Sequence, residues 1–150
     1  MLRSTRGPLA LSALTVLDAP PPQTVTAAAE AGFDYVGVRV FPAGDEPAWP
    51  MIGDTPMVRE TKQRLADTGL TVWDVEVLRI RPDKDPQEAI RVLDAGAALG
   101  ARYVLVNGND PDEERLLHRL NVVASEAASR GITLAVEFMV FTDIKTLAQA

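Results

Sequence analysis

The feature that most constrains the fold of this chain is a regular alternation between short apolar runs and longer segments with the period of an amphipathic helix. Glycine follows the helical segments at Gly32, Gly69, Gly100 and Gly131, where a helix can end in a left-handed residue. Strands that alternate with helices are typical of parallel βα units. The pattern therefore predicts an α/β domain built around a parallel sheet.

Five strands and the helices around them can be placed from this pattern. The predicted strands are residues 11–17, 35–40, 70–80, 102–107 and 133–138. The predicted helices are residues 22–31, 56–68, 86–99 and 110–130, and residues 142–150 predict the start of a last helix that the sequence leaves incomplete. Asp110 is the expected N-cap of the helix over 110–130. The predicted first strand, residues 11–17, is as apolar as a secretion signal. We interpret it as a strand because a helix and a second strand follow it at normal spacing.

The predicted strands are too apolar to face water on either side. Such strands occur in open doubly wound sheets and in (β/α) barrels, and the pattern alone allows both architectures. A chain of 150 residues suits one compact domain better than two. We therefore expect residues 1–150 to belong to a single α/β domain.

Charge and cysteine content exclude several classes of function. Aspartate and glutamate outnumber lysine and arginine by 21 to 15, so the net charge is -6 and nucleic acid is not an expected partner. No apolar run approaches the roughly 20 residues that span a bilayer, and no membrane association is expected. The chain contains no cysteine, which excludes disulfides and thiolate zinc sites and permits a reducing, cytoplasmic location.

One carboxylate interrupts the apolar segment ITLAVEFMVF, residues 132–141, and it belongs to Glu137. Because strand side chains alternate between faces, Leu134, Val136 and Phe138 are expected to face the helices, with Glu137 on the opposite face. In a barrel that opposite face points inward, and barrel active sites lie at the carboxyl ends of the strands. Glu137 is therefore a candidate functional residue.

Strand three repeats this arrangement, with Trp73 expected to face the helices and with Asp74 and Glu76 expected on the inward face. Burying an unpaired carboxylate costs several kcal/mol, so buried acids require cations, hydrogen bonds or a metal ion. Arginines that could pair with these acids stand near the ends of strands two and three, at Arg39, Arg79 and Arg81. A structural ion pair and a functional site both remain open for Asp74 and Glu76.

Four segments of the sequence resemble segments of a known protein family, and they occur in the same order as in that family. LTVLDAPPPQTVTAAAEAGFDYVGVRV, LADTGLTVWDVEVLRI, AAALGARYVLV and LAVEFMVFTDI together resemble the sugar phosphate isomerase/epimerase family, which has a xylose isomerase-like TIM barrel. The resemblance covers nearly the whole chain. It implies that the chain is the N-terminal portion of such a barrel, about five βα units long, and that Glu137 at the end of strand five matches the first metal ligand of the family.

The resemblance also implies a chemistry. Members hold a divalent ion, manganese or magnesium for ligands of this kind, with the strand-five glutamate and with an aspartate, a histidine and a glutamate from later strands. The metal polarises substrate oxygens while neighbouring carboxylates move a proton through an enediolate, which isomerises or epimerises a sugar or polyol. Other members dehydrate or cleave related polyols. In this chain Glu137 is the expected metal ligand and proton-transfer group.

Further residues are candidates for substrate binding. Asn107 can cap a turn or bind a sugar hydroxyl, and Trp49 can stack on a sugar ring or anchor its proline-rich loop. The full set of expected substrate-binding residues is Glu76, Asp74, Asn107, Arg39 and Trp49. His118, the single histidine, is expected on the solvated surface of its helix. The alternative function is a noncatalytic barrel fragment that acts in assembly or binding, with homo-oligomers as the expected products of its open strand edges.

Overall fold

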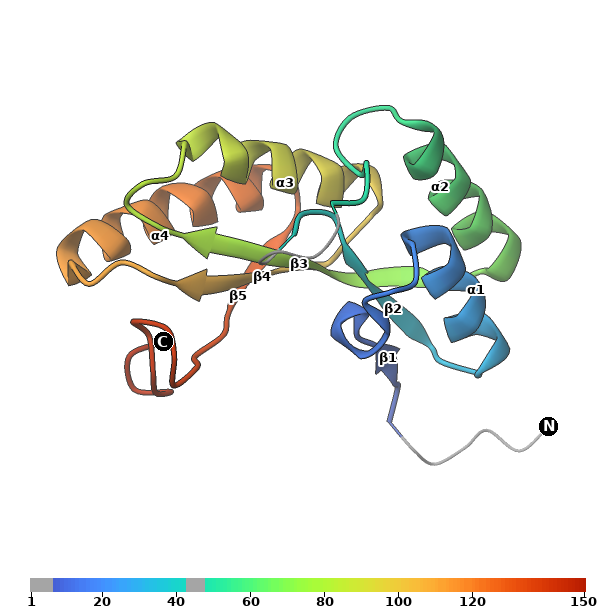
Figure 1. Cartoon of the computed structure of the whole chain (residues 1–150), viewed down its shortest axis with the longest axis horizontal. Helices are drawn as coiled ribbons and strands as arrows, with labels where there is room; N and C mark the ends of the chain where they lie inside the picture. The colour runs from blue at the N-terminus through green and yellow to red at the C-terminus, as the bar shows by residue number, and fades with distance from the viewer. Residues whose placement is uncertain (1–6, 43–47) are drawn as a thin grey trace.

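The computed structural model describes residues 7–42 and 48–150 and forms one parallel sheet covered by helices (Figure 1). The strands are β1 (Ala10–Leu11), β2 (Tyr35–Arg39), β3 (Thr71–Ile80), β4 (Tyr103–Gly108) and β5 (Thr133–Val136). The helices are α1 (Pro21–Glu30), α2 (Pro56–Thr68), α3 (Pro86–Ala98) and α4 (Glu113–Ser129), and a short 3-10 helix, η1 (Ala13–Val16), follows β1. Within the described ranges, no helix is both long and apolar enough to cross a membrane.

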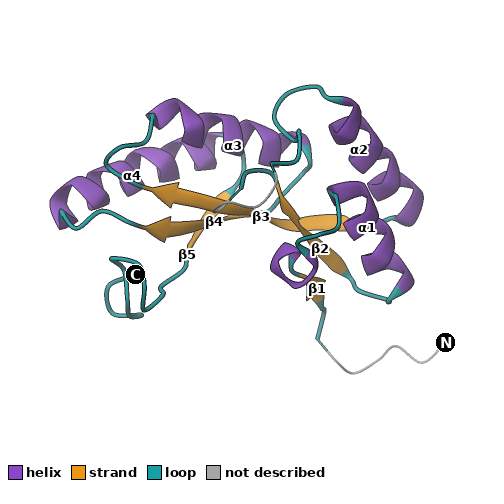
Figure 2. Ribbon diagram, in the orientation of Figure 1, coloured by secondary structure: helices purple, strands orange, loops and turns teal. Residues whose placement is uncertain are grey.

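The order of the strands decides between the two architectures that the sequence allows. The sheet runs β1-β2-β3-β4-β5, and every neighbouring pair is parallel. A doubly wound sheet reverses its order at a switch point, whereas a barrel adds each strand on the same side of the last. Figure 2 shows the helices lying along one face of the sheet, as in the outer layer of a barrel. The fold is therefore the first part of a TIM barrel.

The helix boundaries follow local sequence signals. Proline occupies the first turn of α1, α2 and α3, and Thr55 and Asp85 cap α2 and α3 through their side chains. The four glycines expected after the helices all have φ between 72° and 76°; they are Gly32, Gly69, Gly100 and Gly131. These signals explain why α2 has the predicted bounds.

The core lies between the helices and one face of the sheet. The side chains of Val36, Val38, Val75, Val104 and Val106 on that face are at most 1% exposed. Residues that alternate with these valines lie on the opposite face, which is the interior face of a closed barrel. Burying each valine contributes about 1.5–3 kcal/mol, so this layer supplies much of the stability of the sheet.

The side expected for Trp73 is wrong, because β3 contains a bulge. Val36 and Val38 oppose Val72 and Val75, so two residue steps along β2 match three along β3. Both Val72 and Val75 therefore face the helices, and Trp73 and Asp74 are forced onto the interior face together. Trp73 packs there between two tyrosines, with ring centroids 4.7 Å from Tyr35 and 5.1 Å from Tyr103.

Two predicted strands are longer than the observed ones. In place of the strand expected over 11–17, β1 spans only Ala10–Leu11. Ser12 ends it by capping the 3-10 helix that follows, where its side chain accepts a hydrogen bond from the backbone N–H of Leu14. The strand expected over 133–138 ends at Val136. Phe138 is 45% exposed, so its expected position against the helices is wrong.

Two predictions about helices are also wrong. Asp112, and not Asp110, is the N-cap of α4, because Asp110 forms a turn with Asp112 and an ion pair of 2.6 Å with Arg115. No helix forms over residues 142–150. The hydroxyl of Thr142 instead donates to the carbonyl of Ile144 at 2.7 Å, and this turn lies against the end of β4.

We predict that Gly108→Ala destabilises the protein by about 1–3 kcal/mol. A Cβ atom at Gly108 would lie 2.5 Å from the side chain of Ile144, which is 4% exposed. The turn over residues 139–144 would have to move. The urea midpoint of unfolding should therefore fall, and proteases should cleave the chain faster within this turn. The double variant Gly108→Ala with Ile144→Ala should resist proteolysis better than Gly108→Ala does, but less well than wild type. An unchanged urea midpoint in Gly108→Ala would contradict this packing.

Candidate active site

The interior face of the sheet carries three acidic side chains, two from β3 and one from the end of β5. Glu76 and Asp74 come from β3, and Glu137 comes directly after β5. Asp74 is 9% exposed and Glu76 is 4% exposed. The sequence prediction that these strands direct carboxylates to the same interior therefore agrees with their positions in the fold.

Glu76 is held by three donors. Its Oε2 lies 3.1 Å from the Nη2 of Arg39, which stands opposite it in the register of β2 and β3. Its Oε1 accepts hydrogen bonds from the hydroxyl of Ser12 at 3.3 Å and the backbone N–H of Leu14 at 3.2 Å. Of the two roles left open by the sequence, Glu76 therefore has the contacts of a structural ion pair that fixes η1 over the end of the sheet.

Asp74 has a different environment. Burial first, and then the negative charges of Glu76 and Glu137, raise the pKa of its carboxyl to about 6, although a backbone hydrogen bond lowers it. Gly37 makes room for this carboxyl, since a Cβ atom at Gly37 would lie 2.8 Å from Oδ1 of Asp74. Asp74 can thus exchange a proton near neutral pH.

Glu137 is oriented by Asn107. The side-chain amide of Asn107 donates to Oε2 of Glu137 at 3.2 Å and to its backbone carbonyl at 3.4 Å. Asn107 is 1% exposed, and the backbone N–H of Glu137 donates to Val106 at 2.9 Å. The Glu137 carboxylate is therefore positioned by a buried side chain, while its Oε1 has no hydrogen bond to any described residue.

Trp49 lies in the loop after β2, near Arg39, the ion-pair partner of Glu76. It is half-buried, packs against the core and lines a small hollow with Ala13, Val16 and Arg39. This packing agrees with the anchoring role, and stacking of Trp49 on a ligand stays a prediction. Residues 43–47 of the same loop lie outside the described residues.

Sequence reasoning missed Asn109. Its backbone N–H donates to the carbonyl of Ile80 at 2.9 Å, which continues the pairing of β3 and β4 beyond the strand. The signal was present in the sequence, because Asn109 follows Asn107 at the strand spacing of two residues.

The described residues fit part of a divalent metal site. The carboxylate of Glu137 offers oxygen ligands of the kind that manganese and magnesium prefer. Its hydrogen bond from Asn107 is typical of metal-binding carboxylates, which neighbouring side chains hold in orientation. However, no group of three or more histidine or acidic side chains in the described ranges could hold a metal ion. Glu137 therefore fits one ligand position, and the rest of the set is not found among these residues.

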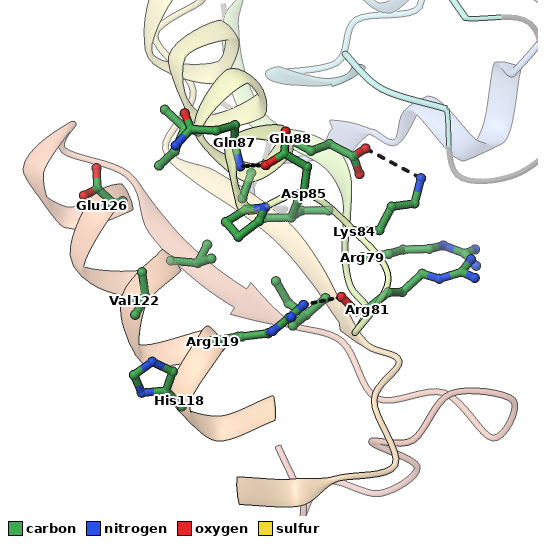
Figure 3. A pocket seen from close by; sticks show the side chains of 16 residues that line it. Arg79, Arg81, Lys84, Asp85, Gln87, Glu88, His118, Arg119, Val122 and Glu126 are labelled. Atoms are coloured by element: carbon green, nitrogen blue, oxygen red, sulfur yellow. Dashed lines mark hydrogen bonds and ion pairs between the residues drawn. The ribbon is translucent and has the colours of Figure 1, made fainter. Parts of the chain in front are cut away.

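A cavity of about 540 Å³ lies between the β3–α3 loop, the start of α3 and the middle of α4 (Figure 3). None of the predicted site residues lines it. His118 is exposed at its edge, as the sequence predicts for that residue. Arg119 closes one side by donating to the carbonyls of Arg81 and Pro82. The lining of the cavity therefore includes none of the three acids Asp74, Glu76 and Glu137.

Sequence comparison decides the family. The model of the family described as xylose isomerase-like TIM barrel matches residues 25–150. The chain belongs to this family. The resemblance and the barrel fold predicted from the sequence are thus confirmed. No curated protein matches the chain.

Several solved structures share the fold of this chain. A xylose isomerase-like TIM barrel protein from Mycobacterium smegmatis in complex with magnesium has a TM-score of 0.66 and 18% identity, over 99% of this chain and 60% of that chain. D-allulose 3-epimerase from Methylomonas sp. has a TM-score of 0.64 and 18% identity, over 97% and 56%. The IOLI protein with a zinc atom has a TM-score of 0.72 and 15% identity, over 95% and 56%. The chain therefore spans a little over half the length of these three structures.

Proposed function

We propose that this chain forms part of a divalent-metal-dependent enzyme that isomerises or epimerises a sugar or polyol. The observation that carries the proposal is the Glu137 carboxylate, which a buried Asn107 orients on the interior face at the carboxyl ends of the strands. Barrel active sites lie at that end. Family membership and the epimerase, magnesium and zinc proteins of the same fold support the proposal.

In this proposal each acid has its own role. Glu137 would hold the metal, manganese or magnesium, which when bound polarises the substrate oxygens. Asp74, with a pKa raised to about 6, accepts the proton from the carbon beside the substrate carbonyl as the enediolate forms, and it returns a proton to carbon when the enediolate collapses to product. Glu76 and Arg39 stay paired and position the β2 and β3 ends, and Asn107 contributes its amide to the same polar surface. We place the reaction in the cytoplasm, with which the absence of cysteine agrees.

The test is proton exchange at the carbon beside the substrate carbonyl. Deuterium incorporation into D-fructose, D-xylulose and their phosphates would be followed by NMR with the purified protein and added Mn²⁺. Glu137→Gln is expected to slow exchange by about 100-fold or more. The matched control is Glu60→Gln, an exposed glutamate of α2 paired with Arg64, which should exchange at the wild-type rate. No exchange by wild type, or equal rates in the two variants, would rule the proposal out.

A second candidate is an assembly role without catalysis. Large apolar side chains are exposed after β5, where Phe138 is 45% exposed, Val140 83%, Phe141 73% and Leu147 75%. Exposed apolar surface of this kind favours association. Analytical ultracentrifugation should then show dimers or larger species that Val140→Lys with Phe141→Lys converts to monomers. A wild-type protein that stays monomeric at about 100 μM would exclude this role, because that concentration would populate even a weak dimer.

A further inference from the structure

The cavity between α3 and α4 has largely apolar walls. Leu78 and Ile80 of β3, Ala89 of α3 and Val123 of α4 line it, and each is at most 8% exposed. Val122 lines it as well and is 49% exposed, so the cavity opens to solvent beside α4. A volume of about 540 Å³ lies within the range of cavities that hold small molecules. The cavity therefore has the size and the lining of a site for a ligand with an apolar body.

Two cross-links hold the walls of the cavity in place. Arg119 of α4 donates to the backbone carbonyls of Arg81 and Pro82, and Figure 3 shows it reaching from α4 to the β3–α3 loop. Arg130, directly after α4, pairs at 2.7 Å with Asp94 of α3. The first turns of α3, which line the cavity, lie between these two links along the chain. The helices are thus tied at both ends of the cavity, as in a site that exists before its ligand binds.

The acids that line the cavity already have partners. Glu88 pairs with Lys84 at 3.6 Å. Glu126 pairs with Arg130 at 2.7 Å. The side chain of Asp85 caps α3. A cationic ligand would have to displace one of these contacts, so the polar lining does not favour a cation.

Arg119 supplies the positive charge at the cavity. It is half-buried, and in the described ranges it forms no ion pair with an acid. Its hydrogen bonds to two backbone carbonyls leave further N–H donors on the guanidinium and do not neutralise its charge. Figure 3 shows Arg79 and Arg81 extending away from His118 and Glu126, so Arg119 is the arginine that borders the space between the helices. An anion that enters the cavity would meet this charge, on a protein whose net charge is -6.

We propose that this cavity binds an amphipathic anion, a monocarboxylate with an aliphatic body. The body lies along the aliphatic side chains of Ile80, Ala89 and Val122, and the carboxylate binds the guanidinium of Arg119. A guanidinium presents a planar fork of N–H donors that matches the two oxygens of a carboxylate. The inference is independent of the proposed function, because the lining includes none of the three acids of the candidate active site.

Three probes test the two halves of the ligand. Isothermal titration calorimetry would compare octanoate, octanamide and acetate with the purified protein and without added metal. Octanamide has the aliphatic body without the charge, and acetate has the charge without the body. We expect octanoate to bind about tenfold tighter than either of the others, or better. Equal binding of octanoate and octanamide, equal binding of octanoate and acetate, or no binding of octanoate would overturn the inference.

Variants at the two ends of the site locate the contacts. Arg119→Met is expected to weaken octanoate binding by about tenfold or more, whereas Arg59→Met, which removes an exposed arginine of α2, should leave it unchanged. Val122→Trp should also weaken octanoate binding by about tenfold, because the indole fills the opening of the cavity. Since Val122 is 49% exposed, this variant should keep the wild-type Tm and provides the test if Arg119→Met fails to fold. Wild-type affinity in either folded variant would overturn the proposal.

NMR separates the cavity from the other apolar surface of the protein. Amide chemical shifts of the nitrogen-labelled protein would be followed during titration with octanoate. We expect the largest changes at Ala89, Ile90 and Val122, which line the cavity. Phe138 and Val140, exposed after β5, should change little. Largest changes at Phe138 and Val140 would show that octanoate covers exposed apolar surface, and the cavity would then not be its site.

Discussion

Replacing Arg39 with methionine is expected to lower the free energy of unfolding by about 3–5 kcal/mol. The Arg39 and Glu76 side chains are 10% and 5% exposed, and their charged atoms are 3.1 Å apart. Removing the guanidinium leaves the Glu76 carboxylate buried without its cation, and desolvation of that charge is the cost. Urea unfolding at neutral pH measures the change.

The double variant Arg39→Met with Glu76→Met distinguishes the cost of an unpaired buried charge from the cost of altered packing. Replacing both partners of a buried pair with apolar groups is often close to neutral, so the double variant should recover most of the lost stability. The remaining loss should come from Ser12 and Leu14, which donate to Glu76 and hold η1. If the free energy of unfolding of Arg39→Met lies within about 1 kcal/mol of the wild-type value, the ion pair is exposed to water, which contradicts its burial in the structure.

Replacing Asp74 with asparagine is expected to raise stability at neutral pH by roughly 2–3 kcal/mol. The pKa of Asp74 is about 6 in the folded protein against an ordinary value of 3.8, so the folded state binds its proton more tightly than the unfolded state does. The stability this gives is complete below the ordinary value and falls as pH rises through about 6. Asparagine has nearly the same shape and carries no charge at any of these pH values.

The measurement is urea unfolding of wild type and Asp74→Asn at about pH 5 and about pH 7.5. Wild type should lose about 1–1.5 kcal/mol relative to the variant between the two conditions. Asp67→Asn, at an exposed position of α2 next to Gln63, is the matched control and should follow the wild-type pH dependence. If Asp74→Asn and Asp67→Asn give parallel pH profiles, Asp74 is ionised at both pH values and the acidic cluster does not raise its pKa.

The parallel sheet and the helix positions could be predicted because they depend on local signals. Proline at the start and glycine at the end fix α2 to Pro56–Thr68, as the sequence indicates. The position of Glu137 on the interior face also follows from the alternation of side chains along the strand, because β5 has no bulge in its pairing with β4. Its roles as metal ligand and proton-transfer group remain predictions.

Other features depend on contacts between distant residues. The bulge that turns Trp73 onto the interior face is a mismatch in register between β2 and β3, and no alternation within β3 alone reports it. The helix expected over 142–150 is replaced by a turn because Ile144 packs over Gly108, a contact 36 residues apart in the chain. Asn107 was predicted as a candidate, but its hydrogen bond to Glu137 required the register of β4 and β5.

The most direct test of the proposed site is the affinity of the protein for Mn²⁺, measured by isothermal titration calorimetry. Glu137→Gln keeps the shape of the side chain and the acceptor for Asn107 but loses the charge that a divalent ion requires. The proposal predicts that wild type and Glu60→Gln bind Mn²⁺ equally and that Glu137→Gln binds it at least about tenfold more weakly. Equal affinity in all three proteins would contradict the assignment of Glu137 as a metal ligand.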